Sequence, residues 1–364
     1  MKKVKRIILI ILGVILSVFI ILFLIVWINS PGKLKPLKDE TGKKIERALV
    51  EKEWLEIGGI KQGFFIRSEN PDNPVILYLH GGPGSPELPL IEATEKSERL
   101  EKYFTVCYWD QRGAGMTYHK GIDAESATVP QYVEDTREIT EYLIKRFGKE
   151  KIYLMGHSWG SYLGAKVIQK YPGYYYAYMG IGQVTHQHLS EQLAYQYMME
   201  RAKETNDKKV IKSLSKYDPN VPGFPTNEYL ITARMPNINK YGIGITHKPY
   251  SMFSLIKDVL LFKGYTLSDK SNYTKGNMFS LKNVFPYVIA DNLFESSISF
   301  QTPVYVIHGL YDYQVSHELA KKWVDSIQAP DKRLYTFQNS AHSPNMEEQT
   351  KFVTTVREIA GRHK

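Results

Sequence analysis

Apolar residues gather first in one long run at the N-terminus. The stretch from Ile7 to Ile28 carries no charge and follows the cationic segment Lys2–Arg6. At 1.5 Å per residue a helix of this length spans about 33 Å, enough to cross a hydrocarbon core of about 30 Å. Trp27 stands at the far end, where aromatic residues often mark the membrane interface. We therefore expect residues 1–30 to form a cytoplasmic tail and a transmembrane anchor.

A cleaved signal peptide is the alternative interpretation of this run. Signal peptides have an apolar core of only about 7–15 residues and a small-residue cleavage site, and this sequence shows neither feature. The basic tail favours a cytoplasmic N-terminus, although the lysine-rich residues 33–47 on the other side weaken that argument. We expect a single-pass protein of the cell membrane whose large domain lies outside the cytoplasm.

Short apolar runs alternate with helical periodicity through most of the remaining chain. Strands are expected over 54–57, 63–66, 75–80, 104–109, 152–155, 178–181, 303–308 and 333–337, and helices over 131–147, 161–171, 317–327 and 347–360. Alternation of this kind is typical of a mainly parallel sheet with helices on both faces, so the fold class is α/β.

The pattern changes between residues 182 and 298. This stretch is rich in Tyr, Met, Asn and Lys, contains helical segments and lacks clear strands. We expect an inserted, mostly helical cap over 182–298 between two parts of a core at 49–181 and 299–364. Residues 31–48 are polar, contain prolines, and are predicted to be a linker.

Composition narrows the possible classes of function. Of 364 residues, 43% are hydrophobic and 23% charged, which is ordinary for a folded protein and excludes a disordered or fibrous chain. One cysteine cannot form an internal disulfide or a multi-cysteine metal site. The net charge of +9 would suit nucleic acid or an anionic membrane, but the basic residues are scattered and no nucleic-acid motif is present. The sequence predicts no metal, no cofactor and no nucleic-acid partner, and it leaves the oligomeric state open.

The strongest chemical signal is the segment Gly156-His157-Ser158-Trp159-Gly160, which matches G-x-S-x-G between a predicted strand and a predicted helix. Such a turn is strained and tightly packed, so residues without a Cβ are needed on both sides of the serine. It presents the serine hydroxyl at the carboxyl end of the sheet. We therefore predict Ser158 as a catalytic nucleophile.

A serine hydroxyl needs a base to accept its proton, and the base needs an orienting acid. At this kind of turn the chain order is serine, acid, histidine. His342 follows the last predicted strand and is the predicted base, while Asp312 follows the preceding strand and is the predicted acid. Asp325, inside a predicted helix, and Asp291, in the predicted cap, are weaker candidates for the acid.

A second glycine-rich segment, residues 80–84 (HGGPG), follows the predicted strand 75–80. Acyl transfer develops negative charge on an oxygen atom, which backbone N–H groups can stabilise. We predict an oxyanion hole built from the N–H of Trp159 and the N–H of Gly82. A phosphate-binding loop is excluded, because no Lys-Ser/Thr pair follows and the loop does not open directly into a helix.

A third motif, DQRGAGMT over residues 110–117, completes a recognisable set. HGGPG, DQRGAGMT and GHSWGS, followed by Asp312 and His342, resemble the α/β-hydrolase superfamily and within it the prolyl iminopeptidase-like branch, over about 50–181 and 299–364. The resemblance implies an α/β-hydrolase fold, a triad of Ser158, His342 and Asp312, and a helical cap over the site. By that resemblance Gly81, Pro83, Gly84 and Arg112 belong to loops that border the substrate pocket. Arg112 is expected to fix its loop rather than to react.

The resemblance implies a serine hydrolase that removes N-terminal residues, often proline, from short peptides through an acyl-enzyme. Aminopeptidases of this branch bind the substrate amine with carboxylates of the cap. The cap carboxylates of this chain follow no pattern that matches those of the family. A hydrolase of small esters or lipids is therefore the alternative, and a non-catalytic anchored binding module is a third possibility. The expected partners are a small-molecule or short-peptide substrate and the membrane.

Overall fold

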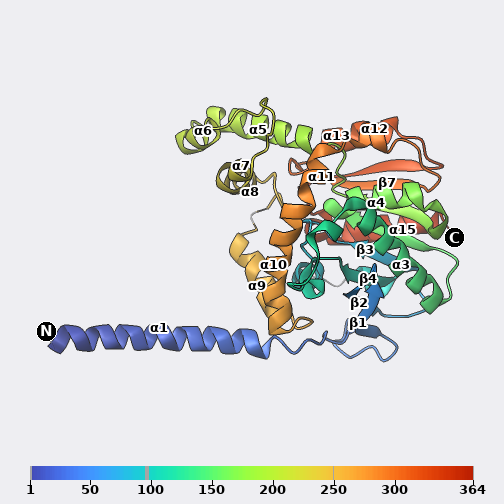
Figure 1. Ribbon diagram of the computed structural model, residues 1–364. Helices are drawn as coiled ribbons and strands as arrows, with labels where there is room; N and C mark the ends of the chain where they lie inside the picture. The colour runs from blue at the N-terminus through green and yellow to red at the C-terminus, as the bar shows by residue number, and fades with distance from the viewer. Residues whose placement is uncertain (1, 95–97, 249, 364) are drawn as a thin grey trace.

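A single eight-stranded sheet forms the centre of the molecule in the computed structural model, which describes residues 2–94, 98–248 and 250–363 (Figure 1). The strands lie in the order β1-β2-β4-β3-β5-β6-β7-β8. Their bounds are β1 Leu49–Ile57, β2 Ile60–Ser68, β3 Val75–Leu79, β4 Thr105–Asp110, β5 Ile152–His157, β6 Tyr175–Ile181, β7 Val304–Gly309 and β8 Lys332–Phe337. β1 and β2 form an antiparallel hairpin at one edge, and the strands from β4 to β8 pair in parallel.

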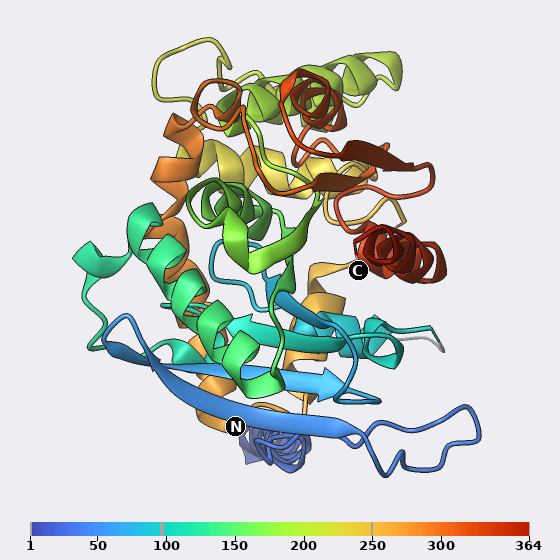
Figure 2. The ribbon, with the colours of Figure 1, turned by 90° about the vertical axis from the view of Figure 1, so that its right-hand side faces the viewer.

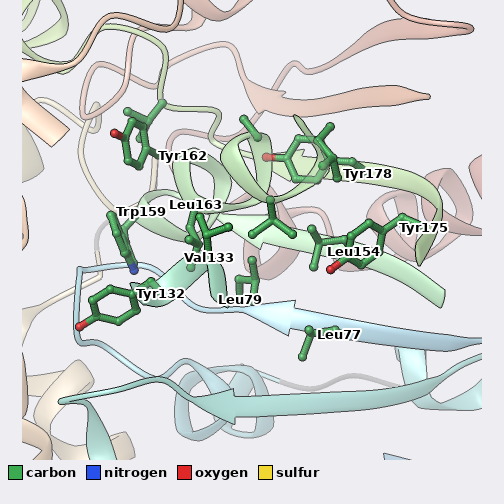
Figure 3. Close-up of a cluster of buried hydrophobic side chains, with 14 of the residues drawn as sticks. Leu77, Leu79, Tyr132, Val133, Leu154, Trp159, Tyr162, Leu163, Tyr175 and Tyr178 are labelled. Atoms are coloured by element: carbon green, nitrogen blue, oxygen red, sulfur yellow. The ribbon is translucent and has the colours of Figure 1, made fainter. Parts of the chain in front are cut away.

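Helices cover both faces of this sheet, as the alternating pattern predicts (Figure 2). α3 (Val129–Phe147), α4 (Trp159–Lys170) and α13 (His317–Ser326) pack into one apolar cluster with the strands. α2 (Leu88–Thr94) and α15 (Gln349–Gly361) contribute to the cluster on the opposite face. Figure 3 shows part of the first cluster, where leucines of β3 and β5 meet aromatic side chains of α3 and α4. Both faces of β3, β4, β5 and β7 are therefore buried, which explains their continuous apolar sequences.

The segment between β6 and β7 is helical. It contains α5 Gln187–Glu204, α6 Lys208–Leu214, α7 Asn227–Tyr229, the π-helix η5 Leu230–Arg234, α8 Met235–Lys240, α9 Met252–Leu261, α10 Leu267–Asn283, α11 Phe285–Ala290 and α12 Leu293–Ser296. Residues of α5, α6, α7, η5 and α8 share a separate apolar cluster. α10 crosses the loops that follow β3 and β4, with Asn277 Nδ2 donating to the Ser85 hydroxyl at 2.7 Å. This segment therefore forms a layer over the carboxyl end of the sheet.

The N-terminal helix α1 (Lys2–Ile28) extends away from the rest of the molecule (Figure 1). It is the one helix among the described residues that is long and apolar enough to cross a membrane. The span Lys3–Ile28 has a mean hydropathy of 3.5 over its most apolar window, and none of that window is buried. A signal sequence near the N-terminus has the same length and composition.

The strands differ from the sequence prediction mainly at their ends. The hairpin β1–β2 is several residues longer than the predicted strands 54–57 and 63–66. The last predicted helix, 347–360, corresponds to α15 within two residues, and the short α14 (Pro344–Glu347) precedes it. α2 was not predicted, because it is one short segment with proline inside and little periodicity. These differences do not move the loops in which the predicted site residues lie.

Candidate active site

The turn between β5 and α4 holds Ser158 in a strained conformation. Its backbone angles are φ 55° and ψ −120°, and it is one of two non-glycine residues with positive φ in the described chain. The flanking glycines allow the close packing: a Cβ on Gly156 would lie 2.1 Å from the Gly160 oxygen, and one on Gly160 would lie 2.1 Å from the Leu79 oxygen. Non-glycine residues in such conformations cost about 1–3 kcal/mol and are concentrated at functional sites.

The strained turn leaves the serine side chain partly exposed at the carboxyl end of the sheet. The backbone N–H of Ser158 donates to the Ile181 carbonyl at 2.9 Å, which ties the turn to the end of β6. The N–H of Trp159 is the first of α4 and points out of the helix end, where it has no partner within its own helix. The indole of Trp159 is buried and donates to the side chain of Gln111 at 2.8 Å.

His342 and Asp312, thirty positions apart in sequence, meet beside this turn. Asp312 Oδ2 accepts from His342 Nδ1 at 2.8 Å, and both residues are almost fully buried. The imidazole lies over Gly182, where an added Cβ would be 2.9 Å from the ring. Gly182 directly follows Ile181, the residue that binds the Ser158 N–H. The predicted base therefore lies at the same end of the sheet as the serine turn, without a hydrogen bond from its Nε2 to Ser158 in this structure.

The other ring nitrogen of His342 is available for proton transfer. Nε2 is buried and has no hydrogen-bond partner within the described ranges of the chain. Burial lowers the pKa of His342 from its ordinary value, and the carboxylate of Asp312 opposes that shift. An imidazole with a lowered pKa is neutral at pH 7 and can accept a proton at Nε2.

Asp312 remains ionised in spite of its burial. Burial alone would raise its pKa, but His342 and His308 lower the pKa far below the ordinary value of a carboxyl group. The backbone N–H of Val315 also donates to Oδ1 at 2.9 Å. The two weaker candidates for the acid of the triad lie elsewhere. Asp325 is exposed and paired with Lys321, and Asp291, which follows α11 in the cap, is paired with Lys166 of α4.

The glycine-rich loop after β3 lies against the serine turn. A Cβ on Gly81 would be 3.0 Å from the Cβ of Ser158, so the loop backbone approaches the serine as closely as glycine permits. Gly82 has φ +112°, a conformation that favours glycine, and it precedes Pro83 through a cis peptide bond. Gly84 packs under Ser280 of α10, where a Cβ would be 2.6 Å from the serine side chain. The loop thus passes between the serine turn and the cap.

Sequence reasoning missed a buried carboxylate–imidazole pair at this loop. Glu87 accepts hydrogen bonds from the Gly81 N–H at 2.8 Å, from the Tyr78 hydroxyl at 2.6 Å and from His157 Nδ1 at 2.8 Å. His157 Nε2 in turn donates to the His342 carbonyl at 2.8 Å. Both ring nitrogens of His157 therefore face acceptors, the arrangement that suits a doubly protonated, cationic ring beside an ionised Glu87.

The directions of the two pKa shifts agree with this charge assignment. Burial opposes the charge on His157, but the neighbouring Glu87 carboxylate raises its pKa above the ordinary value. Burial likewise opposes the charge on Glu87, and His157 lowers its pKa. The rings of His157 and His342 are 4.8 Å apart, so a buried cation lies beside the predicted base. The only sequence signal was the position of His157 directly before the serine.

The guanidinium of Arg112 is bound by groups of the protein itself. It donates to both carboxylate oxygens of Asp135, at 2.8 and 3.0 Å, and to the Gly58 carbonyl at 2.8 Å. The side chain is almost fully buried. The guanidinium is thus taken up by contacts within the protein, the arrangement expected of a residue that fixes its loop.

A cavity of about 320 Å³ lies between α5 and the start of α13 and reaches Asp312. Its lining includes Tyr197, Glu200, Tyr313 and Glu318. Glu318 is paired with Lys322, whereas Glu200 has no ion-pair partner among the residues that the structure describes.

Three other cap carboxylates are engaged in ion pairs. Glu191 is fully buried and neutralised by Arg234, whose Nε lies 2.8 Å from its carboxylate. Asp269 is paired with Lys52. Glu204 is paired with Arg201 on the surface.

In the described ranges, no group of three or more histidine, cysteine, aspartate or glutamate side chains could hold a metal ion. Cys107 is fully buried in β4, and burial raises the pKa of its thiol. A thiol in this state is a poor nucleophile, so the serine turn is the candidate for nucleophilic chemistry.

Comparison with known proteins agrees with this geometry. A sequence profile of the family described as "alpha/beta hydrolase fold" matches residues 74–349. The "Probable aminopeptidase YbaC" of Bacillus subtilis (strain 168) is 34% identical over 309 residues, which cover 85% of this chain and 96% of that protein. The proline iminopeptidase of Neisseria gonorrhoeae is 32% identical over 119 residues, 33% of this chain and 36% of that protein.

Among solved structures, the proline iminopeptidase-related protein of Thermus thermophilus superposes with a TM-score of 0.61. The match covers 86% of this chain and 98% of that protein at 18% sequence identity, so it concerns the fold alone. The predicted fold class is confirmed by these matches, as is the resemblance to the iminopeptidase-like branch.

Proposed function

Since this chain belongs to the α/β-hydrolase fold family, we propose that it is a membrane-anchored serine hydrolase that removes N-terminal residues from short peptides. The single observation that supports this most is the pairing of His342 with Asp312 beside the strained Ser158, with Nε2 of the imidazole unpartnered in the described chain. The similarity to a probable aminopeptidase over most of the chain favours peptides as the substrate class.

In the proposed mechanism His342 Nε2 accepts the proton of Ser158 as its oxygen attacks the substrate carbonyl. Asp312 holds the ring through Nδ1 and stabilises the imidazolium that forms. The N–H groups of Trp159 and Gly82 donate to the oxyanion. Removing one such donor typically costs about 2.7–4 kcal/mol of transition-state stabilisation.

The leaving amine takes its proton from the His342 imidazolium, and an acyl group remains on Ser158. A water molecule then gives a proton to His342 and attacks the acyl carbonyl, which releases the acid and restores the serine hydroxyl. The chemistry as proposed uses no metal and no cofactor.

Recognition of a free substrate amine is proposed for the cavity between α5 and α13, which reaches the triad from the Asp312 side and whose lining does not include Ser158 or His342. Glu200 lines this cavity together with Asp312, and a carboxylate without an ion-pair partner in the described chain is suited to an ammonium group. The ion pair between Glu191 and Arg234 leaves one cap carboxylate fewer to bind a substrate amine. This observation favours the alternative substrate class, a small ester.

The apolar helix α1 is proposed as an uncleaved anchor. The residues that directly follow it are built into the folded domain: Lys270 donates to the Asn29 carbonyl at 2.6 Å and to the Ser30 hydroxyl at 2.9 Å. The basic tail favours a cytoplasmic N-terminus, and we propose that the catalytic domain lies outside the cytoplasm.

Labelling with a fluorophosphonate probe tests the nucleophile. Ser158→Ala is expected to abolish labelling, and Ser213→Ala, at a partly exposed position on α6 of the cap, to leave it unchanged. Labelling that persists in Ser158→Ala would refute the assignment. Substrate class is tested with a proline anilide, its N-acetylated form and a short-chain p-nitrophenyl ester. The peptidase proposal requires turnover of the free-amine anilide and loss of turnover on acetylation.

A further inference from the structure

The end of α1 is fixed rigidly to the cap. The buried ammonium group of Lys270 in α10 donates to Asn29 and Ser30 at the end of α1 and to the Leu260 carbonyl of α9 at 2.7 Å. The backbone N–H of Lys33 donates to the Lys263 carbonyl at 3.0 Å, immediately after α9. The direction of α1 relative to α9 and α10 is therefore set by the fold and not by a flexible linker.

This connection determines which face of the catalytic domain lies nearest the membrane. In Figure 1 the helices α7, α8 and α9 lie on the side of the domain toward which α1 extends. Transmembrane helices tilt on average by about 20° from the bilayer normal. With α1 in a bilayer, the same side of the domain faces the lipid surface.

Large apolar side chains are exposed on these helices. On α9, Phe253 is 75% exposed and Ile256 is 48% exposed, one turn apart on the same face. On η5 and α8, Ile231 is 66% exposed and Met235 is 43% exposed, also about one turn apart. Lys257 on α9 is also exposed, and it is ion-paired with Asp258 at 3.5 Å. An apolar helix face with a flanking lysine is typical of helices that rest in a membrane interface.

Positive charge lies on the same side of the molecule. α6 extends beyond the sheet in the direction of α1 (Figure 1). Its exposed cations are not ion-paired within the described part of the chain: Lys208, Lys209, Lys212 and the following Lys216. Each lysine near a membrane surface is attracted by anionic lipid headgroups.

We propose that the α8–α9 face of the cap docks on the lipid bilayer that holds α1, with Ile231, Met235, Phe253 and Ile256 in the interface and the α6 lysines at anionic headgroups. This proposal rests on α1 being the membrane anchor. The partner is a phospholipid surface containing anionic lipid, because the face combines apolar side chains with cations next to a membrane span.

Docking would also bear on the active site. The segment between α8 and α9 covers the catalytic histidine: the Gly244 carbonyl accepts from the His342 N–H, and the Ile243 carbonyl accepts from the Tyr313 N–H, both at 3.1 Å. The ring of His247 stacks on Tyr311 at 3.8 Å. The two docking helices therefore hold the ends of the segment that lies over His342.

Site-specific fluorescence in nanodiscs can test the docking. The single Cys107 is fully buried, so an introduced cysteine is the site that reacts with an NBD label. The full chain is labelled separately through F253C on α9, L16C in the middle of α1, and I298C, an exposed apolar control near β7. Each is reconstituted as one copy per disc in phosphatidylcholine with about 30% phosphatidylglycerol, the anionic lipid that attracts lysines, with and without doxyl-labelled lipid.

Docking is supported if the doxyl lipid quenches the L16C and F253C labels at least about two-fold and leaves the I298C label unchanged. Docking is overturned if the L16C label is quenched while the F253C label behaves like I298C. If the L16C label is not quenched, the proposed anchor itself fails, and the docking proposal fails with it. The L16C label thus distinguishes failure of the anchor from failure of docking.

A second variant tests the contribution of the apolar face. The pair F253E and I256E is introduced into the full chain labelled through M235C, with L16C as the reference position. Quenching at M235C is expected to fall at least about two-fold while quenching at L16C is unchanged. Equal quenching of M235C with and without the two glutamates contradicts an apolar contact. Because the label reports depth directly, the result does not depend on enzyme activity.

Discussion

The buried cation of His157 should control the pH at which His342 becomes active. The two rings are 4.8 Å apart, and at an effective dielectric constant of about 20 a charge at that distance disfavours protonation of His342 by about 3.5 kcal/mol. The carboxylate of Glu87 partly cancels this effect. With the carboxylate taken as about 3 Å farther from His342, its opposing effect is about 2.1 kcal/mol, and the net effect is about 1.3 kcal/mol, or about one pKa unit.

The variant His157→Gln removes this cation from beside the base. A group that repels protons from His342 lowers its pKa, so its loss raises that pKa. The base must be neutral to act, and the acidic limb of the kcat/KM profile reports its pKa in the free enzyme. We expect this limb to move to higher pH by about 0.5–1 unit, with activity near pH 8 least affected.

The assay is the pH profile of kcat/KM for the substrate that the wild-type protein turns over. His119→Gln, which removes an exposed imidazole in the loop after the DQRGAGMT motif, is the control and should leave the profile unchanged. A thermal melt of both variants separates a shifted profile from loss of folded protein. If the acidic limb does not move, or moves to lower pH, His157 does not lower the pKa of His342 through a positive charge.

Three further changes test other parts of the site. Asp312→Asn removes the charge that stabilises the imidazolium and is expected to lower kcat about 10³–10⁴-fold without loss of the fold, measured by steady-state kinetics and a thermal melt. Glu200→Gln should raise KM for a free-amine anilide about ten-fold and leave ester turnover unchanged, with Glu204→Gln as the control. Equal effects on anilide and ester would contradict an amine site. Gly160→Ala adds a Cβ 2.1 Å from a carbonyl oxygen of β3 and should destabilise the protein by about 1–3 kcal/mol in chemical unfolding. Gly173→Ala, where nothing lies within 4 Å of the added Cβ, should change the unfolding free energy little.

The parts of the site that the sequence could predict are those set by local geometry. Ser158 stands between two glycines at a strand–helix turn, and Asp312 and His342 stand in loops after the last two strands. The carboxyl ends of parallel strands meet at one edge, so loop position in the sequence implies proximity in the fold. The same reasoning predicted the strands β3, β4, β5 and β7, whose apolar runs follow from burial on both faces.

The sequence could not reveal the pair of Glu87 and His157. These residues are 70 positions apart, and their hydrogen bond forms because the loop after β3 passes beside the turn after β5. The charged state of His157 follows from the two acceptors that tertiary contacts place at its ring nitrogens. Arg112 shows the same limit, since the motif indicated its loop but not that Asp135 of α3 would take up its guanidinium.

By itself the sequence predicted the candidate residues for chemistry and identified the stretch that is long and apolar enough to cross a membrane, because turn strain, burial period and helix length are local properties. Only the tertiary structure decided the charge state of the groups around His342 and the direction in which α1 leaves the domain. Both depend on distances between residues that are remote in the chain, such as Lys270 and Asn29, and electrostatic energies change steeply with those distances.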